Sequence, residues 1–174
     1  MKILKSNILL AVSLGAIIAF SGCRKDDGAI PDRVTIKEVP AITRPTDPTG
    51  SVSITFTNQA AFSGKFRAEL YFPGAKPPTK IDIVVRKTNG TVINNTNVRL
   101  YRADVMTLPA SFTVTAAEIV ALFGPLTLND NYDFGPDIYV GSDKYEAFPA
   151  VGNGTGAGVI GMPLFKEYAR FRVL

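Results

Sequence analysis

The sequence contains no histidine, no tryptophan and a single cysteine. Without histidine, Ser-His-Asp and Cys-His nucleophiles, histidine-ligated metals and the usual proton shuttle near neutral pH are excluded. A single cysteine excludes an intrachain disulfide and a thiolate zinc site. We therefore expect a protein that is not an enzyme and that holds no metal or cofactor.

The remaining composition is that of a folded chain of modest charge. It has 174 residues, of which 46% are hydrophobic and 20% charged, enough for one domain with a real core. Removal of residues 1–22 would take away Lys2 and Lys5 and no acidic residue, which lowers the formal net charge from +4 to +2. Because no basic stripe or recognition motif is present, we expect no nucleic-acid partner.

Residues 1–22 have the layout of a secretory signal peptide. Lys2 and Lys5 form a positively charged start, and a largely apolar run over residues 8–20 follows. This run has 13 residues, whereas a helix that crosses a bilayer needs about 20. The sequence therefore predicts a cleaved signal rather than a transmembrane anchor.

The sole cysteine, Cys23, directly follows the small residues Ser21 and Gly22. The sequence Phe20-Ser21-Gly22-Cys23 resembles the lipobox of bacterial lipoproteins. This resemblance implies that the Cys23 thiol carries a diacylglycerol and that cleavage makes Cys23 the acylated N-terminus. The alternative is an ordinary signal peptide with a spare thiol, which would be a liability in an oxidising compartment. We therefore expect a stable membrane anchor at Cys23.

Four charged residues, Arg24, Lys25, Asp26 and Asp27, follow the cysteine. Basic residues followed by acidic ones at this place resemble the surface-export signal of lipoproteins from Bacteroidota. The alternative is a generic solvated stem. The resemblance implies a lipid-anchored protein of the outer membrane, exposed at the cell surface.

Residues 23–50 are expected to form an extended stem, and residues 51–174 the folded domain. Prolines recur in the stem among charged and small residues, and no helical or strand period lasts long. Part of the stem, such as residues 34–36, could instead dock on the domain as an edge strand.

Residues 51–174 contain a series of short segments in which apolar and polar residues alternate, as in half-buried strands. Asn89-Gly90 is typical of a hairpin turn, and Gly135-Pro136 suggests a bulge or bend within a strand. The expected strands cover residues 51–57, 66–72, 81–87, 91–93, 98–101, 111–115, 132–140, 145–148 and 168–174.

One short helix interrupts this series. Thr115 and Glu118 fit a capping box, an apolar face follows, and Gly124-Pro125 ends the helix. Short strands with frequent turns and one small helix predict an all-β fold, an immunoglobulin-like antiparallel sandwich of two sheets. The term describes the architecture alone, because the Cys-Trp-Cys pattern of antibody domains is absent.

Three stretches of the domain carry a further resemblance: FTVTAAEIVALFG, YDFGPDIYVGSDKYEAF and the closing ARFRVL. They are similar to the N-terminal domain of SusE-like proteins, which accompany SusC/SusD-type glycan importers. The resemblance implies a non-catalytic spacer or interaction module beside an outer-membrane transporter complex. The starch-binding modules of that family lie further along the chain, so the resemblance does not carry over glycan binding.

Direct binding of a polysaccharide is the alternative function. Glycan recognition usually needs an aromatic side chain flanked by hydrogen-bonding groups. Tyr71, Tyr101 and Tyr139 fall on the outward phase of their expected strands, where ordinary cross-strand packing is the competing interpretation. Their possible polar neighbours are Glu69, Arg99 and Asp137.

Two other patterns favour structural roles. Residues 129–133 and Asp137 are rich in oxygen ligands that suit calcium, but they lack the spacing of an EF-hand and are typical of a turn. The glycine-rich residues 151–158 lack the following helix and the lysine of a phosphate-binding loop. We interpret them as a surface loop.

Catalysis would require paired carboxylates across a cleft. The candidate pairs combine Glu69 with Glu118 or Glu146. Glu118 is already accounted for by the expected helix cap, and no glutamate stands in a distinctive motif. The sequence therefore favours a binding or spacer role over a hydrolase.

Overall fold

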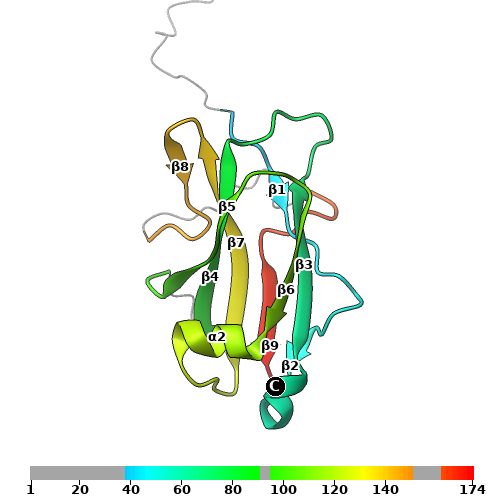
Figure 1. The fold of residues 1–174 in the computed structure, drawn as a ribbon, viewed down its shortest axis with the longest axis vertical. Coiled ribbons are helices and arrows are strands. Elements are labelled where there is room, and N and C mark those ends of the chain that lie inside the picture. Colours follow the sequence, from blue (N-terminus) through cyan, green and yellow to red (C-terminus); the bar gives the residue numbers. More distant parts are fainter. Residues whose placement is uncertain (1–37, 91–94, 151–161) are drawn as a thin grey trace, which may run out of the picture. The chain divides into compact units, whose positions relative to one another are not determined.

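A computed structural model of the chain describes residues 38–90, 95–150 and 162–174. Glu38 to Leu174 form one compact unit, an all-β sandwich of two sheets (Figure 1). The two-sheet fold expected from the alternating pattern is thus confirmed. The unit includes residues 38–50, which the sequence analysis assigned to the stem.

The strands form a small and a large sheet, and all pairs are antiparallel except β2 with β9. The small sheet has the order β1 (Ile42–Thr43), β3 (Ser63–Leu70) and β6 (Ala110–Thr115). The large sheet has the order β2 (Ser53–Ile54), β9 (Ala169–Val173), β7 (Asp130–Val140), β4 (Lys80–Asn89) and β5 (Val98–Val105), and β8 (Asp143–Tyr145) also pairs with β7.

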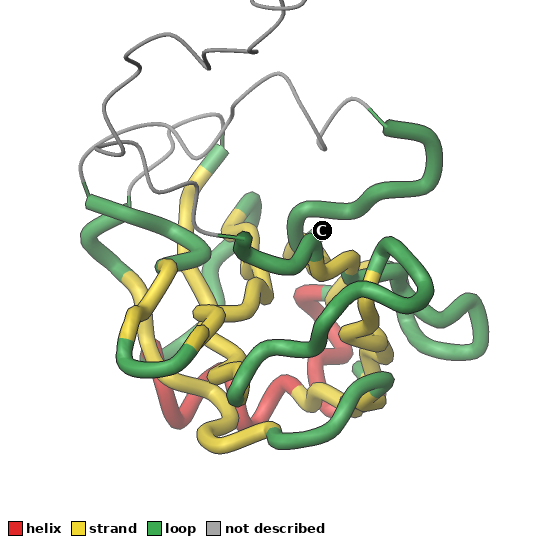
Figure 2. Tube along the Cα trace, turned by 90° about the horizontal axis from the view of Figure 1, so that it is seen from above, coloured by secondary structure: helices red, strands yellow, loops and turns green. Residues whose placement is uncertain are grey.

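Two helical segments lie at the end of the sandwich opposite the β7–β8 turn (Figure 1), and Figure 2 shows the helices in red. They are the 3-10 helix η1 (Phe56–Ala61) and the helix α2 (Ala116–Phe123). The predicted capping box of α2 is confirmed: the Thr115 side chain accepts a hydrogen bond from the Glu118 amide, and the Glu118 carboxylate accepts one from the Thr115 amide.

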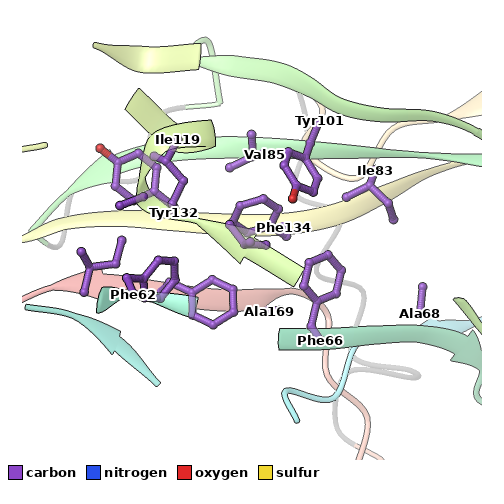
Figure 3. Close-up of a cluster of buried hydrophobic side chains, with 14 of the residues drawn as sticks. Phe62, Phe66, Ala68, Ile83, Val85, Tyr101, Ile119, Tyr132, Phe134 and Ala169 are labelled. Carbon is purple, nitrogen blue, oxygen red and sulfur yellow. The ribbon is translucent and has the colours of Figure 1, made fainter. Parts of the chain in front are cut away.

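The core lies between the sheets and is centred on Phe134 of β7 (Figure 3). Its ring centroid lies 5.1 Å from that of Tyr101, 5.4 Å from Phe66 and 5.8 Å from Phe171. These rings come from β5, β3 and β9, so one side chain joins both sheets. Burial of a large apolar side chain contributes about 1.5–3 kcal/mol, and the cluster therefore fixes the stacking of the two layers.

The first expected strand is much shorter than predicted. Within residues 51–57 only Ser53 and Ile54 pair, and they pair with the last residues of β9. The Phe56 amide then donates to the Leu174 carbonyl, and the chain enters η1. Val52 is 74% exposed, because it lies before the two paired residues.

Part of the expected stem docks as an edge strand, the alternative that the sequence left open, and this strand is β1 at Ile42–Thr43. Ile42 pairs with Leu70 at the edge of the small sheet and is only 2% exposed. A strand of two residues between prolines is too short to show the alternation of apolar and polar residues, so the sequence did not predict its position. Residues 34–36 and the expected hairpin strand 91–93 lie outside the described residues.

The expected bulge at Gly135-Pro136 is wrong, because β7 pairs with β4 in unbroken register from Asp130 to Tyr139. On its other side β7 pairs with β9 only up to Phe134 and with β8 only from Ile138. A proline lacks the amide that a ladder needs, and Pro136 stands in this gap between β9 and β8.

The terminal strands β5 and β6 have irregular or occupied edges. β5 shifts register against β4 twice, and Asp104 within it has a φ of +55°. On β6, the Thr113 carbonyl accepts a hydrogen bond from the Tyr101 hydroxyl at 2.9 Å, and the Thr115 amide donates to Glu118. Bulges and occupied backbone groups both hinder pairing with another strand.

Gly64 of β3 offers a test of the core packing. A Cβ atom added there would lie 2.6 Å from Phe62 Cζ and 2.7 Å from Phe171 Cε1. We expect Gly64→Ala to lower the free energy of unfolding by about 1–3 kcal/mol through overpacking, measured by chemical denaturation. The control, Ser111→Ala on the exposed side of β6, should change it by less than about 0.5 kcal/mol. Equal stability of both variants would contradict this packing.

Candidate functional site

The outer face of the large sheet, opposite the core, carries most of the buried charged residues. On β4 these are Asp82 and Arg86, and on β7 they are Asp133 and Asp137, all less than 9% exposed. Charged side chains are rarely buried unless they are paired. The contacts that compensate each of them therefore define the site.

Asp133 is the most deeply buried of these groups, and two arginines bind it. Its Oδ2 atom lies 2.8 Å from Arg86 Nη2 and 2.9 Å from Arg170 Nη2, and its Oδ1 atom lies 2.6 Å from Arg170 Nε. The Asp133 side chain is fully buried and that of Arg86 is 7% exposed. This ion cluster joins β4, β7 and β9 on the side of the sheet away from the core.

Aromatic rings and a loop cover the ion cluster. The Arg86 guanidinium lies 4.2 Å from the ring centroid of Phe148 and 5.6 Å from that of Tyr168. Gly135 makes room for this cover, because a Cβ there would lie 3.0 Å from Phe148 Cζ. Arg86 also donates to the Asn95 side chain, which in turn donates to the Pro149 carbonyl. Residues 95 and 147–149 are thereby fixed above the sheet.

An open groove of about 590 Å³ lies beside this cover. The β4–β5 side contributes Val84, Asn95, Arg99 and Leu100, and β7 with the segment after it contributes Asp137, Tyr139, Lys144 and Glu146. Asp82 also lines the groove. This mixture of charged, amide, aromatic and aliphatic groups makes it the candidate functional site.

Two carboxylates face each other in the groove. Asp82 and Asp137 are directly opposite cross-strand partners on β4 and β7. Asp82 Oδ1 accepts a hydrogen bond from the Asp104 amide at 2.8 Å. Asp137 Oδ1 accepts one from the Ala147 amide, also at 2.8 Å, and its Oδ2 lies 2.8 Å from Lys144 Nζ. Backbone amides therefore hold both carboxylates in place.

The electrostatics of the groove favour the charged forms of Asp82 and Lys144. Partial burial raises the pKa of Asp82, but hydrogen bonds from the Asp104 amide and the Tyr139 hydroxyl outweigh it, and the net pKa is lowered. The hydrogen bond to Asp137 raises the pKa of Lys144. A glycosidase needs one carboxyl group that stays protonated. The lowered pKa of Asp82 suits this group to accepting hydrogen bonds rather than to donating a proton.

The three tyrosines proposed for glycan binding lie in different surroundings. The outward placement of Tyr101 is wrong: it is 7% exposed and points into the core, while Leu100 is 53% exposed (Figure 3). Tyrosine can replace leucine on the inner face because its hydroxyl reaches the Thr113 carbonyl and Glu118. Burial, the largest cause, and the neighbouring Glu118 carboxylate raise the pKa of Tyr101 to about 12.

Tyr71 and Tyr139 are half-buried and far from equivalent. Tyr71 donates to the Pro163 carbonyl at 2.8 Å and packs edge-on against Phe72 and Phe165. Tyr139 lines the groove, with Lys80 Nζ 4.4 Å from its ring centroid. The structure thus brings Tyr139 together with Arg99 and Asp137, two of the expected polar neighbours.

The candidate calcium ligands are engaged in ion pairs. Asp130 Oδ2 lies 2.9 Å from Lys87 Nζ, and Asp133 and Asp137 bind the basic groups described above. Within residues 38–90, 95–150 and 162–174, no three acidic or sulfur ligands converge as a metal site requires. The glycine-rich residues 151–158 lie outside this part of the chain.

The proposed glycosidase carboxylates likewise have basic partners. Glu69 pairs with Arg67, Glu118 with Arg102, and Glu146 lies 3.5 Å from Lys144. Only Glu146 of these three lines the groove. Glu118 serves the helix cap and the Tyr101 contact, as a structural role would require.

The groove was not predicted as a unit. Asp82, Asn95 and Lys144 escaped notice because they come from separate strands and loops. One signal was present in the sequence. Residues 81–86 are apolar except for Asp82 and Arg86, which fall on the same face of the strand. Polar residues on a strand that is buried on both faces indicate a second covered surface.

The chain matches no family model, no curated protein and no solved structure. In the described part of the chain, no helix has the length and apolar character needed to span a bilayer. Cys23 and the export residues Arg24, Lys25, Asp26 and Asp27 lie outside that part.

Removal of the buried carboxylate tests the ion cluster. In Asp133→Asn, Arg86 would remain buried without its counter-charge, and we expect the free energy of unfolding to fall by about 3–5 kcal/mol. The matched control is Glu69→Gln, which breaks a more exposed pair and should cost about 0–1 kcal/mol. Urea denaturation monitored by circular dichroism distinguishes the two; similar losses would contradict the importance of the buried cluster.

The helix cap predicts a dependence of stability on pH. Partial burial raises the pKa of Glu118, but hydrogen bonds from the Thr115 amide and from Arg102 have the larger, opposite effect. The net pKa is therefore below its ordinary value of 4.5. The stabilisation is present above about pH 4.5 and is lost as the pH falls through the folded-state pKa. Between about pH 7 and pH 3, the melting temperature of Glu118→Gln should therefore fall less than that of the wild type. Parallel curves would contradict this assignment.

Proposed function

We propose that this chain is a surface-exposed outer-membrane lipoprotein that acts as a non-catalytic interaction module, accessory to a SusC/SusD-type glycan uptake complex. The observation that carries the proposal is the lipobox-like sequence at the sole cysteine, followed by Arg24, Lys25, Asp26 and Asp27. A lipid on Cys23 would make the outer membrane the first partner of the chain.

The short distance between the anchor and the folded unit supports this role. Fourteen residues, 24–37, separate Cys23 from Glu38, where the compact unit begins. Even fully extended, a segment of this length spans at most about 50 Å. A module on such a tether stays within reach of proteins in the same membrane, and its local concentration near them is high.

The chemistry of the described surface supports a role outside catalysis. The acidic groups of the groove are bound by amides and lysines, and Glu69 and Glu118 have arginine partners. A surface with these fixed charges can recognise a partner through complementary hydrogen bonds. Spacer or adaptor functions need no more than this.

Direct glycan binding is a second candidate, and the position of Tyr139 favours it. This tyrosine lines the groove beside Asp137, and Asn95 lies in the same lining. Aromatic, carboxylate and amide groups in one open groove are the combination that sugar recognition uses. The candidate concerns the groove alone and requires no change in the proposed location.

Intact cells provide the test of location and anchoring. We expect added protease to digest the wild-type protein from outside and mass spectrometry to find a diacylated Cys23. Replacement of Arg24, Lys25, Asp26 and Asp27 by alanine should protect the protein from the protease while it remains in the membrane fraction. Alanine at Lys65 and Arg67 is the matched control and should leave the digestion unchanged. A free thiol at Cys23, or a soluble periplasmic protein, would overturn the proposal.

Purification in mild detergent tests the partner. We expect affinity capture of the full-length protein to recover a SusC/SusD-type transporter pair from its own cells. Capture from cells that express Cys23→Ser should recover much less of the pair, because the unanchored module loses its local concentration. Recovery of neither transporter protein in the wild-type capture would contradict the accessory role.

A further inference from the structure

The groove on the large sheet combines fixed acceptors with an apolar strip. Across β4 and β7, Asp82 and Asp137 form one cross-strand pair. One outward position further along β4, Val84 pairs with Leu100 of β5. Leu100 is 53% exposed and Val84 is 6% exposed, so Leu100 provides most of the accessible aliphatic surface. The groove thus presents two carboxylates beside a small aliphatic surface.

The carboxylates have capacity for further donors. A carboxylate offers about four acceptor positions, and the Ala147 amide and Lys144 Nζ take two of those on Asp137. On Asp82, the Asp104 amide and the Tyr139 hydroxyl take two, and Lys80 Nζ lies 3.5 Å from Oδ1. Because backbone amides hold Asp82 and Asp137, the acceptors are positioned before any ligand arrives. Donors stand around them, since Asn95, Arg99 and Lys144 also line the groove.

We infer that this groove binds a neutral saccharide chain, whose hydroxyl groups donate to Asp82 and Asp137 and whose C–H face lies on Val84 and Leu100. The inference deepens the glycan-binding candidate of the proposed function and rests on it. A saccharide ring has hydroxyls at its rim and aliphatic hydrogens on its faces, so it matches alternating polar and apolar positions. Pre-positioned acceptors reduce the ordering cost of such a ligand.

The charge of the lining selects a neutral ligand. Three acidic residues, Asp82, Asp137 and Glu146, line the groove against two basic ones, Arg99 and Lys144. A uronic-acid polymer would bring its carboxylates against this surface, and like charges are disfavoured in a partly desolvated site. Neutral polysaccharides meet no such penalty.

The same observations make aromatic stacking on Tyr139 a minor contact and disfavour a peptide. Lys80 Nζ lies over the Tyr139 ring at 4.4 Å, and the Phe148 ring packs on Arg86 at 4.2 Å, so both rings already have cationic partners. An added peptide strand would need a regular edge, and β5 beside the groove shifts register twice. Hydrogen bonding and the aliphatic strip are therefore the main contacts of the saccharide.

Affinity electrophoresis of the purified full-length protein in detergent tests the inference. Native gels would contain dextran, amylopectin, galactomannan or xylan, with polygalacturonate as the acidic probe. We expect at least one neutral polymer to retard the wild type and polygalacturonate to have no effect. Leu100→Glu should weaken the retardation at least tenfold, as an added charge blocks the strip. The matched control is Val52→Glu, the same change at another exposed apolar residue, and should leave it unchanged.

Asp82→Asn provides a second variant, which keeps the shape of the groove and removes one charge. Thermal unfolding checks that each variant is folded. Retardation by no neutral polymer, stronger retardation by polygalacturonate, or equal retardation of the wild type and Leu100→Glu would overturn the inference. So would binding of a peptide library that Leu100→Glu abolishes while the polymers have no effect. Protease digestion on cells reports on the location independently, so failure of the groove and failure of the proposed function give different results.

Discussion

The outer face of the large sheet depends on one buried ion cluster, Asp133 between Arg86 and Arg170. Burial of the Asp133 and Arg86 charges is costly, and Arg170 reaches Asp133 from the more exposed side. Such clusters contribute less to net stability than their geometry suggests. Their value here is positional, because each partner can occupy only the place where the charge is neutralised. Arg86 in turn fixes Asn95 and the ring of Phe148, two groups that line the groove. The shape of the groove therefore follows from an interaction behind it.

The alternation of apolar residues was sufficient to predict most strands because one face of each packs on the core. It failed where pairing, rather than burial, set the limit: residues 51–57 alternate, but only Ser53 and Ile54 find a partner strand. It also failed for the phase of β5, where the sequence favours an inward Leu100 over Tyr101. The hydroxyl of Tyr101 has acceptors inside the sandwich, so the larger ring takes the buried position.

The candidate site was harder to predict than the fold, since topology assembles it. Asp82 and Asp137 are 55 positions apart in sequence and become neighbours only through the β4–β7 register. Tyr139 was identified from its outward phase alone, and that reasoning works where a strand is regular. The cover formed by residues 147–149 could not be predicted from the sequence. Gly135 leaves space for the Phe148 ring, and this contact is known only from the structure.

The form of the four edge strands, β1, β2, β5 and β6, has a consequence for any molecule that is concentrated on a surface. Confinement to two dimensions raises the encounter frequency of identical copies, and an open sheet edge would then template run-on polymers. β1 and β2 have only two residues each, the ladder of β5 is irregular, and side chains occupy backbone groups of β6. Short or irregular edges are poor templates. Crowded copies can thus remain separate units, each with its own groove free.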